Sequence, residues 1–467
     1  MTMTALVRAA ALLVSLLSIL PCARADALTD HPGRWLGKLT LPSGQVLPIG
    51  AEFFTRADGA PWAKIASPDQ FVYDVPVKAI THEADDALVL DAGAARMQLR
   101  WKVDHFEGEW RQGPTPLPLQ LRQVADFPMR VRPQTPQPPF PYREETLAIR
   151  STGGVVLGAT LTVPRAPAHP NVVVLVAGSG PQSRHVNNAG HAMFDVLADA
   201  LARQGLAVLR YDKRGIASST GDYDGHTLVD LQDDAYAVLQ ALASRKQFAR
   251  IGLVGHSEGS QIAAAVAARH PQSVDFLVSL GGVGMSGFDL LLQQDSQWAR
   301  DHGATPEDLA RVMPYVRTYY ETVLATADGQ PRVAALKAVH AALAPRDQDL
   351  IRKLEMNGGT LSPDMAAQAF LPVSLRTDTT RDWSMVRCPV LVLSGSLDHQ
   401  VPPRDNVDGI VAALKAGGNG KVAASVLPSL NHLFQTARSG AEDEYAQIDE
   451  TMAPLAMKKI ADFARAR

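Results

Sequence analysis

The sequence predicts a mostly parallel α/β sheet with helices on both faces, preceded by a small all-β domain. From residue 143 onward, short apolar runs alternate with amphipathic segments of helical length, which is the pattern of buried strands joined by helices. Before residue 126, shorter alternating stretches are separated by turn residues, as in antiparallel sheets. At 467 residues and 46% hydrophobic content, the chain is long enough for two or three domains.

The first 25 residues have the organisation of a secretory signal peptide. Arg8 precedes the apolar run 9–20, which is too short to span a bilayer comfortably, and Ala23-Arg24-Ala25 is a small-x-small cleavage site. We expect cleavage after Ala25 and a periplasmic or secreted protein with no integral membrane association. An uncleaved anchor is one alternative. A lipoprotein anchored at Cys22 is another, which Pro21 disfavours.

Residues 26–125 are expected to form the N-terminal all-β domain. Alternating stretches such as KLTLPSG, AEFFTRADG and ALVLDAG are separated by turn residues about every 8 to 12 positions. The next segment, residues 126–142, contains six prolines between Pro128 and Pro141. Proline lacks an amide donor and disfavours helix in the residue before it, so this segment is predicted to be an extended, semi-rigid linker.

Residues 143–467 are expected to form the α/β domain. Its strand-like runs are TLAIR, VVLGATLTV, NVVVLVAG, LAVLRYD, RIGLVG, DFLVSLGG, PVLVLSG and AASVLP, and its helix-like segments include HAMFDVLADALARQG and TLVDLQDDAYAVLQALASR. Residues 285–385, approximately, have helical patterns and no strand pattern. Such a long connection is usually a functional insertion, so we predict a helical lid there.

The stretch GHSEGS places Ser257 between two glycines. The preceding IGLV is predicted to be a strand and the following QIAAAVAARH a helix, which is the context of a G-x-S-x-G nucleophile elbow. Gly255 and Gly259 suit a turn too tight for side chains. We therefore predict that Ser257 is a nucleophile held above the sheet edge, with the amide dipoles of the next helix facing the developing negative charge.

A serine nucleophile needs a base, and the base needs an orienting carboxylate. At an elbow of this kind, the acid and the histidine follow later strands, in that order. Asp398 follows PVLVLSG, and His432 follows AASVLP. The predicted catalytic triad is Ser257, Asp398 and His432; the alternatives are a solvated turn aspartate and a loop or core histidine.

An oxyanion formed at Ser257 needs two backbone amide donors. One is expected from Glu258, which follows the nucleophile. The other is expected from the turn GSGPQSR, where Ser179 is favoured and Gly180 is the alternative. A plain tight turn is the other interpretation of this glycine-rich stretch.

Composition and spacing argue against several other classes. The net charge of −3 is scattered, so we expect no nucleic-acid partner. The 13 histidines include no HExxH or comparable ligand spacing, so we predict no metal. We also expect no cofactor. GGVGMSG matches a dinucleotide-binding fingerprint from Gly282 to Gly287, but it lies late in the sheet and before the lid. A binding protein without catalysis is a further alternative, against which the intact triad argues.

Five stretches, VAGSGPQSR, YDKRGIASS, VGHSEGS, SGSLDHQVPP and LNHLFQ, occur in this order. With them, residues 143–467 resemble the α/β-hydrolase superfamily, especially its bacterial carboxylesterase and serine aminopeptidase-like branch. The resemblance implies the α/β-hydrolase fold and assigns the triad and oxyanion hole to Ser257, Asp398, His432, Ser179 and Glu258.

The resemblance also implies that YDKRG, with Asp212 and Arg214, forms a structural turn near the site. An exposed ion pair between the two is the alternative interpretation. The all-β domain and the lid depart from simple members of the superfamily and leave the substrate class open.

The expected activity is hydrolysis of a small carboxylic ester through an acyl-enzyme, with a serine aminopeptidase as the alternative. An aminopeptidase needs carboxylates that converge on a free ammonium group. The acids of the predicted lid are dispersed: Asp289, Asp295, Glu307, Asp308, Glu321 and Glu355. Glu258 is the exception, since it lies beside the nucleophile.

The apolar side chains of the predicted lid have two interpretations: they form the wall of an acyl pocket, or they form a helical core. These residues are Phe288, Leu291, Trp298, Tyr315, Tyr319 and Tyr320.

Overall fold

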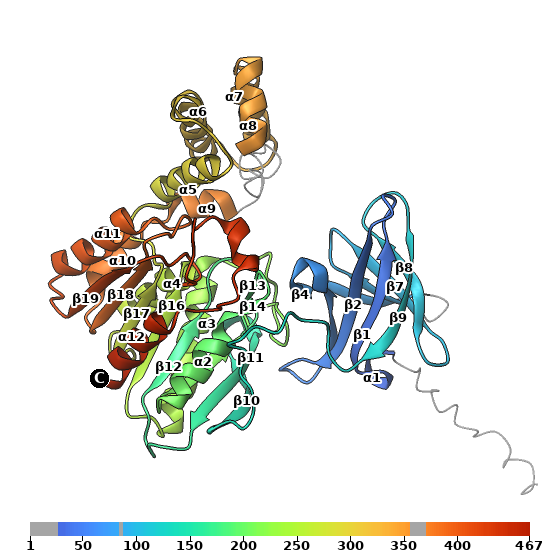
Figure 1. Cartoon of the computed structure of the whole chain (residues 1–467), viewed down its shortest axis with the longest axis horizontal. Coiled ribbons are helices and arrows are strands. Elements are labelled where there is room, and N and C mark those ends of the chain that lie inside the picture. Colours follow the sequence, from blue (N-terminus) through green and yellow to red (C-terminus); the bar gives the residue numbers. More distant parts are fainter. Residues whose placement is uncertain (1–26, 84–86, 355–369) are drawn as a thin grey trace, which may run out of the picture.

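The computed structural model describes residues 27–83, 87–354 and 370–467. It contains two large sheets, a nine-stranded sheet near the N-terminus and an eight-stranded sheet in the rest of the chain (Figure 1). The expected signal peptide, residues 1–25, lies outside the described residues, and so does Glu355.

The nine-stranded sheet is antiparallel throughout, in the order β4-β3-β2-β1-β9-β8-β7-β6-β5. It follows the short helix α1 (Ala27–Asp30), and its strands are β1 (Gly33–Thr40), β2 (Val46–Thr55), β3 (Pro61–Ser67), β4 (Val72–Pro76), β5 (Ala79–His82), β6 (Leu88–Asp91), β7 (Arg96–Trp101), β8 (Phe106–Arg111) and β9 (Leu117–Val124). Its core is aromatic: the Phe106 ring lies edge-to-face with Trp35 and Phe53, at centroid distances of 4.9 and 5.4 Å. The β-rich N-terminal region expected from the sequence is therefore present.

The eight-stranded sheet has the order β10-β11-β15-β12-β16-β17-β18-β19. The β10–β11 and β11–β15 pairs are antiparallel, and all others are parallel. Its strands are β10 (Tyr142–Arg150), β11 (Val156–Pro164), β12 (Val172–Val176), β15 (Ala207–Tyr211), β16 (Ile251–His256), β17 (Phe276–Leu280), β18 (Val390–Gly395) and β19 (Val422–Leu427). The mostly parallel sheet predicted from the apolar runs is confirmed. A separate two-stranded ribbon, β13 (Asn187–Asn188) and β14 (His191–Ala192), lies in the loop after β12.

Helices cover both faces of this sheet. In β12, Val172 and Val174 face one core and Val173 and Leu175 face the other, because side chains alternate along a strand. The first core is closed by α3 (Leu228–Arg245), α4 (Glu258–Arg269), α10 (Thr379–Met385) and α11 (Pro403–Ala416). The second is closed by α2 (Met193–Arg203) and α12 (Pro454–Arg465).

The connection between β17 and β18 is helical in its described part. Its helices are α5 (Gly287–Asp301), α6 (Pro306–Ala325), α7 (Gln330–Ala341), α8 (Pro345–Leu354), α9 (Phe370–Arg376) and α10. Helices α6, α7 and α8 project away from the sheet in Figure 1. The expected lid extended to about residue 385 and so included α10. Trp383 of α10 is fully buried in the core of the α/β sheet, so this last helix packs on the sheet instead.

The proline-rich segment 126–142 is anchored to the α/β domain. The buried Arg132 guanidinium donates to the carbonyls of Ile448 at 2.6 Å and Ala446 at 2.9 Å. Gln134 donates to the carbonyl of Met452 at 2.8 Å. These hydrogen bonds to backbone carbonyls compensate for much of the burial of the two side chains, so this segment is held at fixed points along its length.

The N-terminal domain contacts the loop that follows β12. The Asp74 carboxylate accepts hydrogen bonds from Lys64 Nζ at 2.7 Å and from the Ser183 hydroxyl at 2.6 Å. Burial by itself raises the pKa of Asp74, but the Lys64 ammonium outweighs this effect and holds the pKa below its usual value. The Phe71 ring lies against Gly190, where a Cβ atom would come within 2.7 Å of it.

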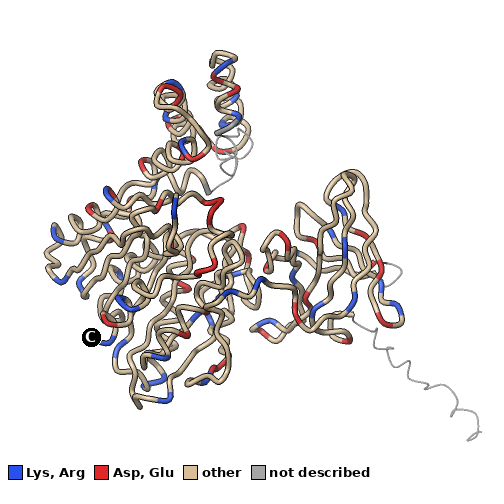
Figure 2. Tube along the Cα trace, viewed as in Figure 1, with Lys and Arg blue, Asp and Glu red and all other residues tan. Residues whose placement is uncertain are grey.

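Charged residues are distributed over both domains. In the view of Figure 2, Lys and Arg lie interspersed with Asp and Glu along the chain, consistent with a net charge of −3. Across the described residues, every helix is too short or too polar to cross a bilayer.

We predict that Asp74→Ala loosens the loop after β12. The substitution removes the acceptor of Ser183 and one carboxylate partner of the partly buried Lys64, which costs about 1–2 kcal/mol of local stability. Amide hydrogen exchange of residues 183–192 should accelerate about 5- to 30-fold. Asp104→Asn, at an exposed ion pair with Arg122, is the control and should leave this exchange unchanged. Equal exchange in both variants would contradict the prediction.

Candidate active site

Ser257 lies on a strained turn between β16 and α4. Its backbone has φ 56° and ψ −124°, a conformation that a non-glycine residue rarely adopts and that costs of order 1–3 kcal/mol. A Cβ atom on Gly255 would lie 2.3 Å from the carbonyl oxygen of Gly259, and one on Gly259 would lie 2.1 Å from that of Val176. Both flanking glycines are therefore required by backbone contact, as the tight turn expected from the sequence demands.

Asp398 and His432 form a buried hydrogen-bonded pair. Asp398 follows β18, His432 follows β19, and His432 Nδ1 lies 2.9 Å from Asp398 Oδ2. Both residues are 2% exposed. The other carboxylate oxygen accepts the amides of Val401 at 2.8 Å and Gln400 at 3.1 Å, so the loop backbone fixes the orientation of the acid.

The turn after β17 lies next to both Ser257 and this pair. The Ser257 amide donates to the carbonyl of Leu280 at 2.9 Å. A Cβ atom built on Gly281 would lie 3.1 Å from Asp398 Oδ2 and from His432 Nδ1. The strands that precede the three candidate residues are parallel, so the three residues lie at the same, carboxyl edge of the sheet. The sheet thus brings Ser257, Asp398 and His432 to one region.

His256 holds the backbone of His432 and was not singled out from the sequence. Its Nε2 lies 2.9 Å from the carbonyl oxygen of His432, and the two rings lie 4.7 Å apart. Burial and the neighbouring His432 lower the pKa of His256 to about 3. The ring is therefore neutral, and since a carbonyl only accepts, the proton is assigned to Nε2. Its place directly before the nucleophile is the only sequence signal that marks it.

The pKa of His432 is raised above its usual value. Burial alone lowers it, but the charge of Asp398 and the hydrogen bond between the two side chains outweigh burial. An imidazole in this setting gains a proton readily and keeps its Nδ1–H directed at the carboxylate. This is the arrangement expected of a general base oriented by an acid.

Backbone amides are available for an oxyanion on two sides of Ser257. Within the described residues, the amides of Ser179, Gly180 and Glu258 donate to no acceptor of the chain. Glu258 begins α4, where amides lack helical partners. A Cβ atom on Gly178, just before Ser179, would lie 3.1 Å from Ser257 Cβ, so this turn passes close to the serine.

The YDKRG stretch forms a buried turn rather than an exposed ion pair. Asp212 pairs with Arg184 through two hydrogen bonds, of 2.6 and 3.0 Å. Arg214 pairs with Asp234 and Asp230 of α3 instead of with Asp212. Both motif residues are almost fully buried, so the alternative of an exposed pair between them is wrong.

The glycines of the candidate dinucleotide fingerprint pack against the protein itself. A Cβ atom on Gly282 would lie 2.2 Å from the hydroxyls of Ser260 and Ser279. One on Gly284 would lie 2.1 Å from the carbonyl of Asn406, and one on Gly287 would lie 1.8 Å from that of Ser374. Close packing within the fold accounts for all three glycines.

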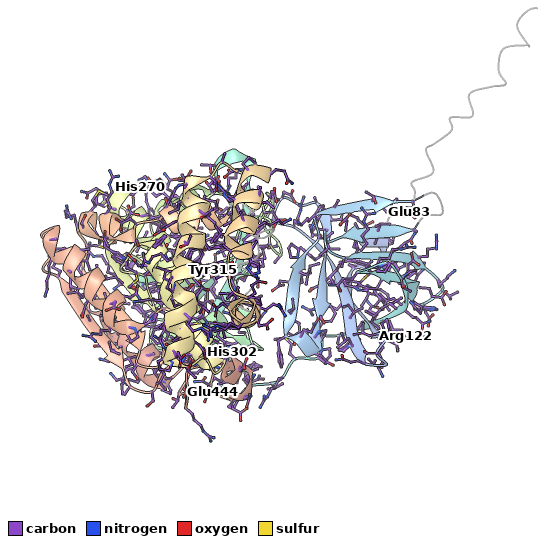
Figure 3. All side chains as sticks on the ribbon, turned by 90° about the horizontal axis from the view of Figure 1, so that it is seen from above. Glu83, Arg122, His270, His302, Tyr315 and Glu444 are labelled. Carbon is purple, nitrogen blue, oxygen red and sulfur yellow. The ribbon has the colours of Figure 1, made fainter. Side chains whose placement is uncertain are left out.

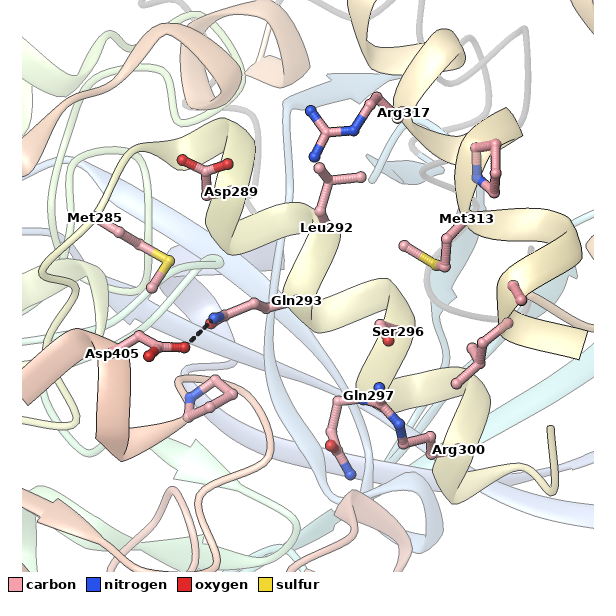
Figure 4. A pocket seen from close by; sticks show the side chains of 14 residues that line it. Met285, Asp289, Leu292, Gln293, Ser296, Gln297, Arg300, Met313, Arg317 and Asp405 are labelled. Atoms are coloured by element: carbon pink, nitrogen blue, oxygen red, sulfur yellow. Dashed lines mark hydrogen bonds between the residues drawn. The ribbon is translucent and has the colours of Figure 1, made fainter. Parts of the chain in front are cut away.

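An open groove of about 1030 Å³ lies between α5, α6 and the start of α11 (Figure 4). Its floor includes Leu292 and Met313, and Gln293 bonds to Asp405 of α11 at 2.7 Å. None of the three candidate triad residues lines it.

The residues considered for an acyl-pocket wall lie outside this groove. Tyr315, Tyr319 and Tyr320 are buried in the core of the helical insertion, and Phe288 and Leu291 pack against that core. Trp298 stacks on His302.

A carboxylate outside the predicted site lies near His432. Glu442 belongs to the 3-10 helix η4 (Glu442–Gln447), which lies beside the end of α5 in the region labelled by His302 and Glu444 in Figure 3. The surrounding protein raises the pKa of Glu442 by reducing its hydration; His432 opposes this effect and Asp301 adds to it. Nothing in the local sequence of η4 marks this residue.

The fold and the arrangement of these residues define a member of the α/β-hydrolase superfamily. The sequence model of the family described as serine aminopeptidase, S33, matches residues 171–435, more than half of the chain. The chain belongs to this family, which confirms the resemblance found in the sequence. The matched region contains Ser257, Asp398 and His432.

Two curated relatives share 27% identity with the chain over their aligned regions. One is esterase EstD of Thermotoga maritima, aligned over 28% of this chain and 31% of its own length. The other is a putative carbamate hydrolase, RutD, of a Caulobacter species, aligned over 42% of this chain and 64% of its own length. The chain thus spans less than two thirds of either relative.

Solved structures with a similar fold have low sequence identity. A proline iminopeptidase of Mycobacterium smegmatis is 16% identical with a TM-score of 0.43, covering 69% of this chain and 98% of its own. An esterase of Pyrococcus furiosus is 15% identical with a TM-score of 0.40, covering 70% of this chain and 93% of its own.

We predict that Asp398→Asn slows hydrolysis and shifts its pH dependence. A base must be neutral to accept a proton, so kcat/KM should rise with pH through the raised pKa of His432. The amide removes the charge that raises this pKa, so the acidic limb should move to lower pH. The plateau should fall about 10³- to 10⁴-fold, because an amide also favours the wrong tautomer.

The measurement is the pH profile of kcat/KM on a nitrophenyl ester. Asp408→Asn, at an exposed position on α11, is the control and should match the wild-type profile. A plateau within tenfold of wild type would assign the orienting role to another carboxylate.

Proposed function

We propose that this α/β-hydrolase cleaves carboxylic esters through an acyl-enzyme on Ser257. The buried hydrogen bond between Asp398 and His432, at the sheet edge that also holds the strained Ser257 turn, is the observation that carries the proposal. A hydroxyl, an imidazole and a carboxylate in this order supply a nucleophile, its base and the group that orients the base. The esterase among the relatives supports the same substrate class.

In the proposed mechanism, His432 Nε2 takes the proton of Ser257 as its oxygen attacks the ester carbonyl. Asp398 holds the Nδ1–H and stabilises the imidazolium that forms. The oxyanion accepts hydrogen bonds from the amides of Glu258 and Ser179, with Gly180 as the alternative donor. The imidazolium then protonates the leaving alcohol, and water activated by His432 hydrolyses the acyl-enzyme.

An ester is favoured over a peptide because the carboxylate of the residue that follows the nucleophile is already paired. Glu258 Oε2 lies 2.9 Å from Lys213 Nζ. A substrate ammonium would have to compete with this nearly buried lysine. Glu258 was the residue for which the sequence left an amine-binding role open, and its ion pair argues against that role.

A serine aminopeptidase remains the second candidate, and a specific observation favours it. Glu442 lies close enough to His432 and to Asp301 for their charges to affect its pKa. A carboxylate near the catalytic base could pair with the free amine of a substrate, which needs a negative partner. The family description points the same way.

Two further assignments belong to this proposal. Helices α5–α9 act as a lid, supported by their position after β17, whose end lies beside Ser257. Residues 1–25 direct export to the periplasm or the medium and are removed after Ala25, supported by their charge and hydropathy pattern.

We predict that Ser257→Ala abolishes turnover and keeps the fold. The turn tolerates a methyl side chain and loses only the nucleophile, so kcat should fall about 10⁴-fold or more. A fluorophosphonate should label wild type and leave the variant unlabelled. Ser244→Ala, on the exposed face of α3, is the control. Undiminished labelling of Ser257→Ala would remove Ser257 from the mechanism.

We also predict that short- and medium-chain nitrophenyl esters have higher kcat/KM than aminoacyl or prolyl anilides. Glu442→Gln should change ester turnover little, because an ester carries no amine for Glu442 to bind. If an anilide with a free amine were the better substrate, and Glu442→Gln or blocking of the amine abolished its turnover, the assignment would change to aminopeptidase.

A further inference from the structure

We propose that Lys213 is a positioning residue that aligns both amide donors of the oxyanion hole. This inference rests on the proposed function and adds a residue that neither the triad nor the expected oxyanion hole includes. Lys213 follows β15, which lies beside β12 in the sheet. Its side chain is therefore placed at the same sheet edge as Ser179 and Ser257.

The Lys213 ammonium contacts both sides of the candidate oxyanion hole. Nζ donates to the carbonyl oxygen of Gly178 at 2.6 Å and to Glu258 Oε2 at 2.9 Å. Gly178 is joined to Ser179, and Glu258 is the other expected donor residue. One nearly buried cation, 4% exposed, thus connects the two segments that supply the amides.

The contact with Gly178 controls the direction of the Ser179 amide. The C=O and N–H groups of a trans peptide point in opposite directions from one rigid plane, and the Gly178–Ser179 bond is not among the cis bonds of the described residues. When Lys213 holds the carbonyl on one side, the Ser179 N–H is fixed on the other. Oxyanion donors act through such preorganisation, because they need not reorient as charge develops.

The contact with Glu258 has an electrostatic consequence. The Glu258 carboxylate belongs to the residue whose amide is to receive a negative oxygen. Without a partner, its charge would oppose the oxyanion in a region of reduced dielectric constant. The Lys213 ammonium compensates this charge and holds the side chain at the start of α4.

The test compares Lys213→Met with wild type in the full chain on a nitrophenyl ester, with kcat expressed per site titrated by a fluorophosphonate. Loss of the positioning contact should lower kcat about 10- to 100-fold, less than the 10²- to 10³-fold loss typical of removing a donor itself. KM should change less than threefold, because the ground-state carbonyl uses these donors little. Affinity for a trifluoromethyl ketone, which forms a tetrahedral adduct, should fall by a factor similar to that of kcat.

Lys213→Arg is a second variant for the same measurement, in case Lys213→Met does not fold. Arg keeps the positive charge, but its planar fork does not reproduce a single donor between two acceptors, so a smaller loss in kcat per titrated site is expected. Lys458→Met, at an exposed ion pair on α12, is the control and should leave both constants unchanged.

Three results would overturn the inference: wild-type kcat per site in both Lys213 variants, a loss confined to KM, or a kcat loss without weaker ketone binding. Ester turnover that survives Ser257→Ala would instead refute the proposed function. The two failures are therefore distinguishable.

Discussion

The close approach of α4 to β12 and β16 is the constraint on which the site depends. With no side chain at Gly259, its Cα comes close to the carbonyl of Val176, and with none at Gly255 the turn folds back on itself. These contacts hold Ser257 at a positive φ angle. A strained residue persists only where its surroundings fix it from several sides, and here two strands and a helix do so.

Buried ion pairs extend this fixed region to the loops around the serine. Lys213, Asp212 and Arg214 are consecutive, yet each binds a different element: the Gly178 turn and α4, the loop at Arg184, and α3. A buried charge left without its partner is costly. The three pairs therefore maintain a single arrangement of the segments at the carboxyl edge of the sheet.

The N-terminal domain and the proline-rich segment contact the same loop from outside. Asp74 binds Ser183, and Arg132 donates to the carbonyl of Ala189 at 3.2 Å. Between them Val186 has φ 51°, which is unfavourable for a β-branched residue. External contacts thus hold a strained loop that begins at the candidate oxyanion turn, and this links the all-β domain to the geometry of the site.

The sequence by itself determined the strands of the α/β sheet, the β-rich N-terminal region and the position of the serine turn. These features depend on local pattern: apolar runs such as NVVVLVAG suit a strand buried on both faces, and glycines at both sides of Ser257 suit a turn with no space for side chains. Asp398 and His432 were predictable for a related reason, since each directly follows a strand of a parallel sheet.

Only the tertiary structure decided which charged and aromatic groups meet. Lys213 binds Glu258 and Arg184 binds Asp212 across long sequence separations, and Glu442 of η4 lies near His432. The same holds for Tyr319 and Tyr320, which lie in the helical core. Local sequence sets which way a helix or strand turns its side chains, whereas the partner of a buried charge depends on how distant elements pack.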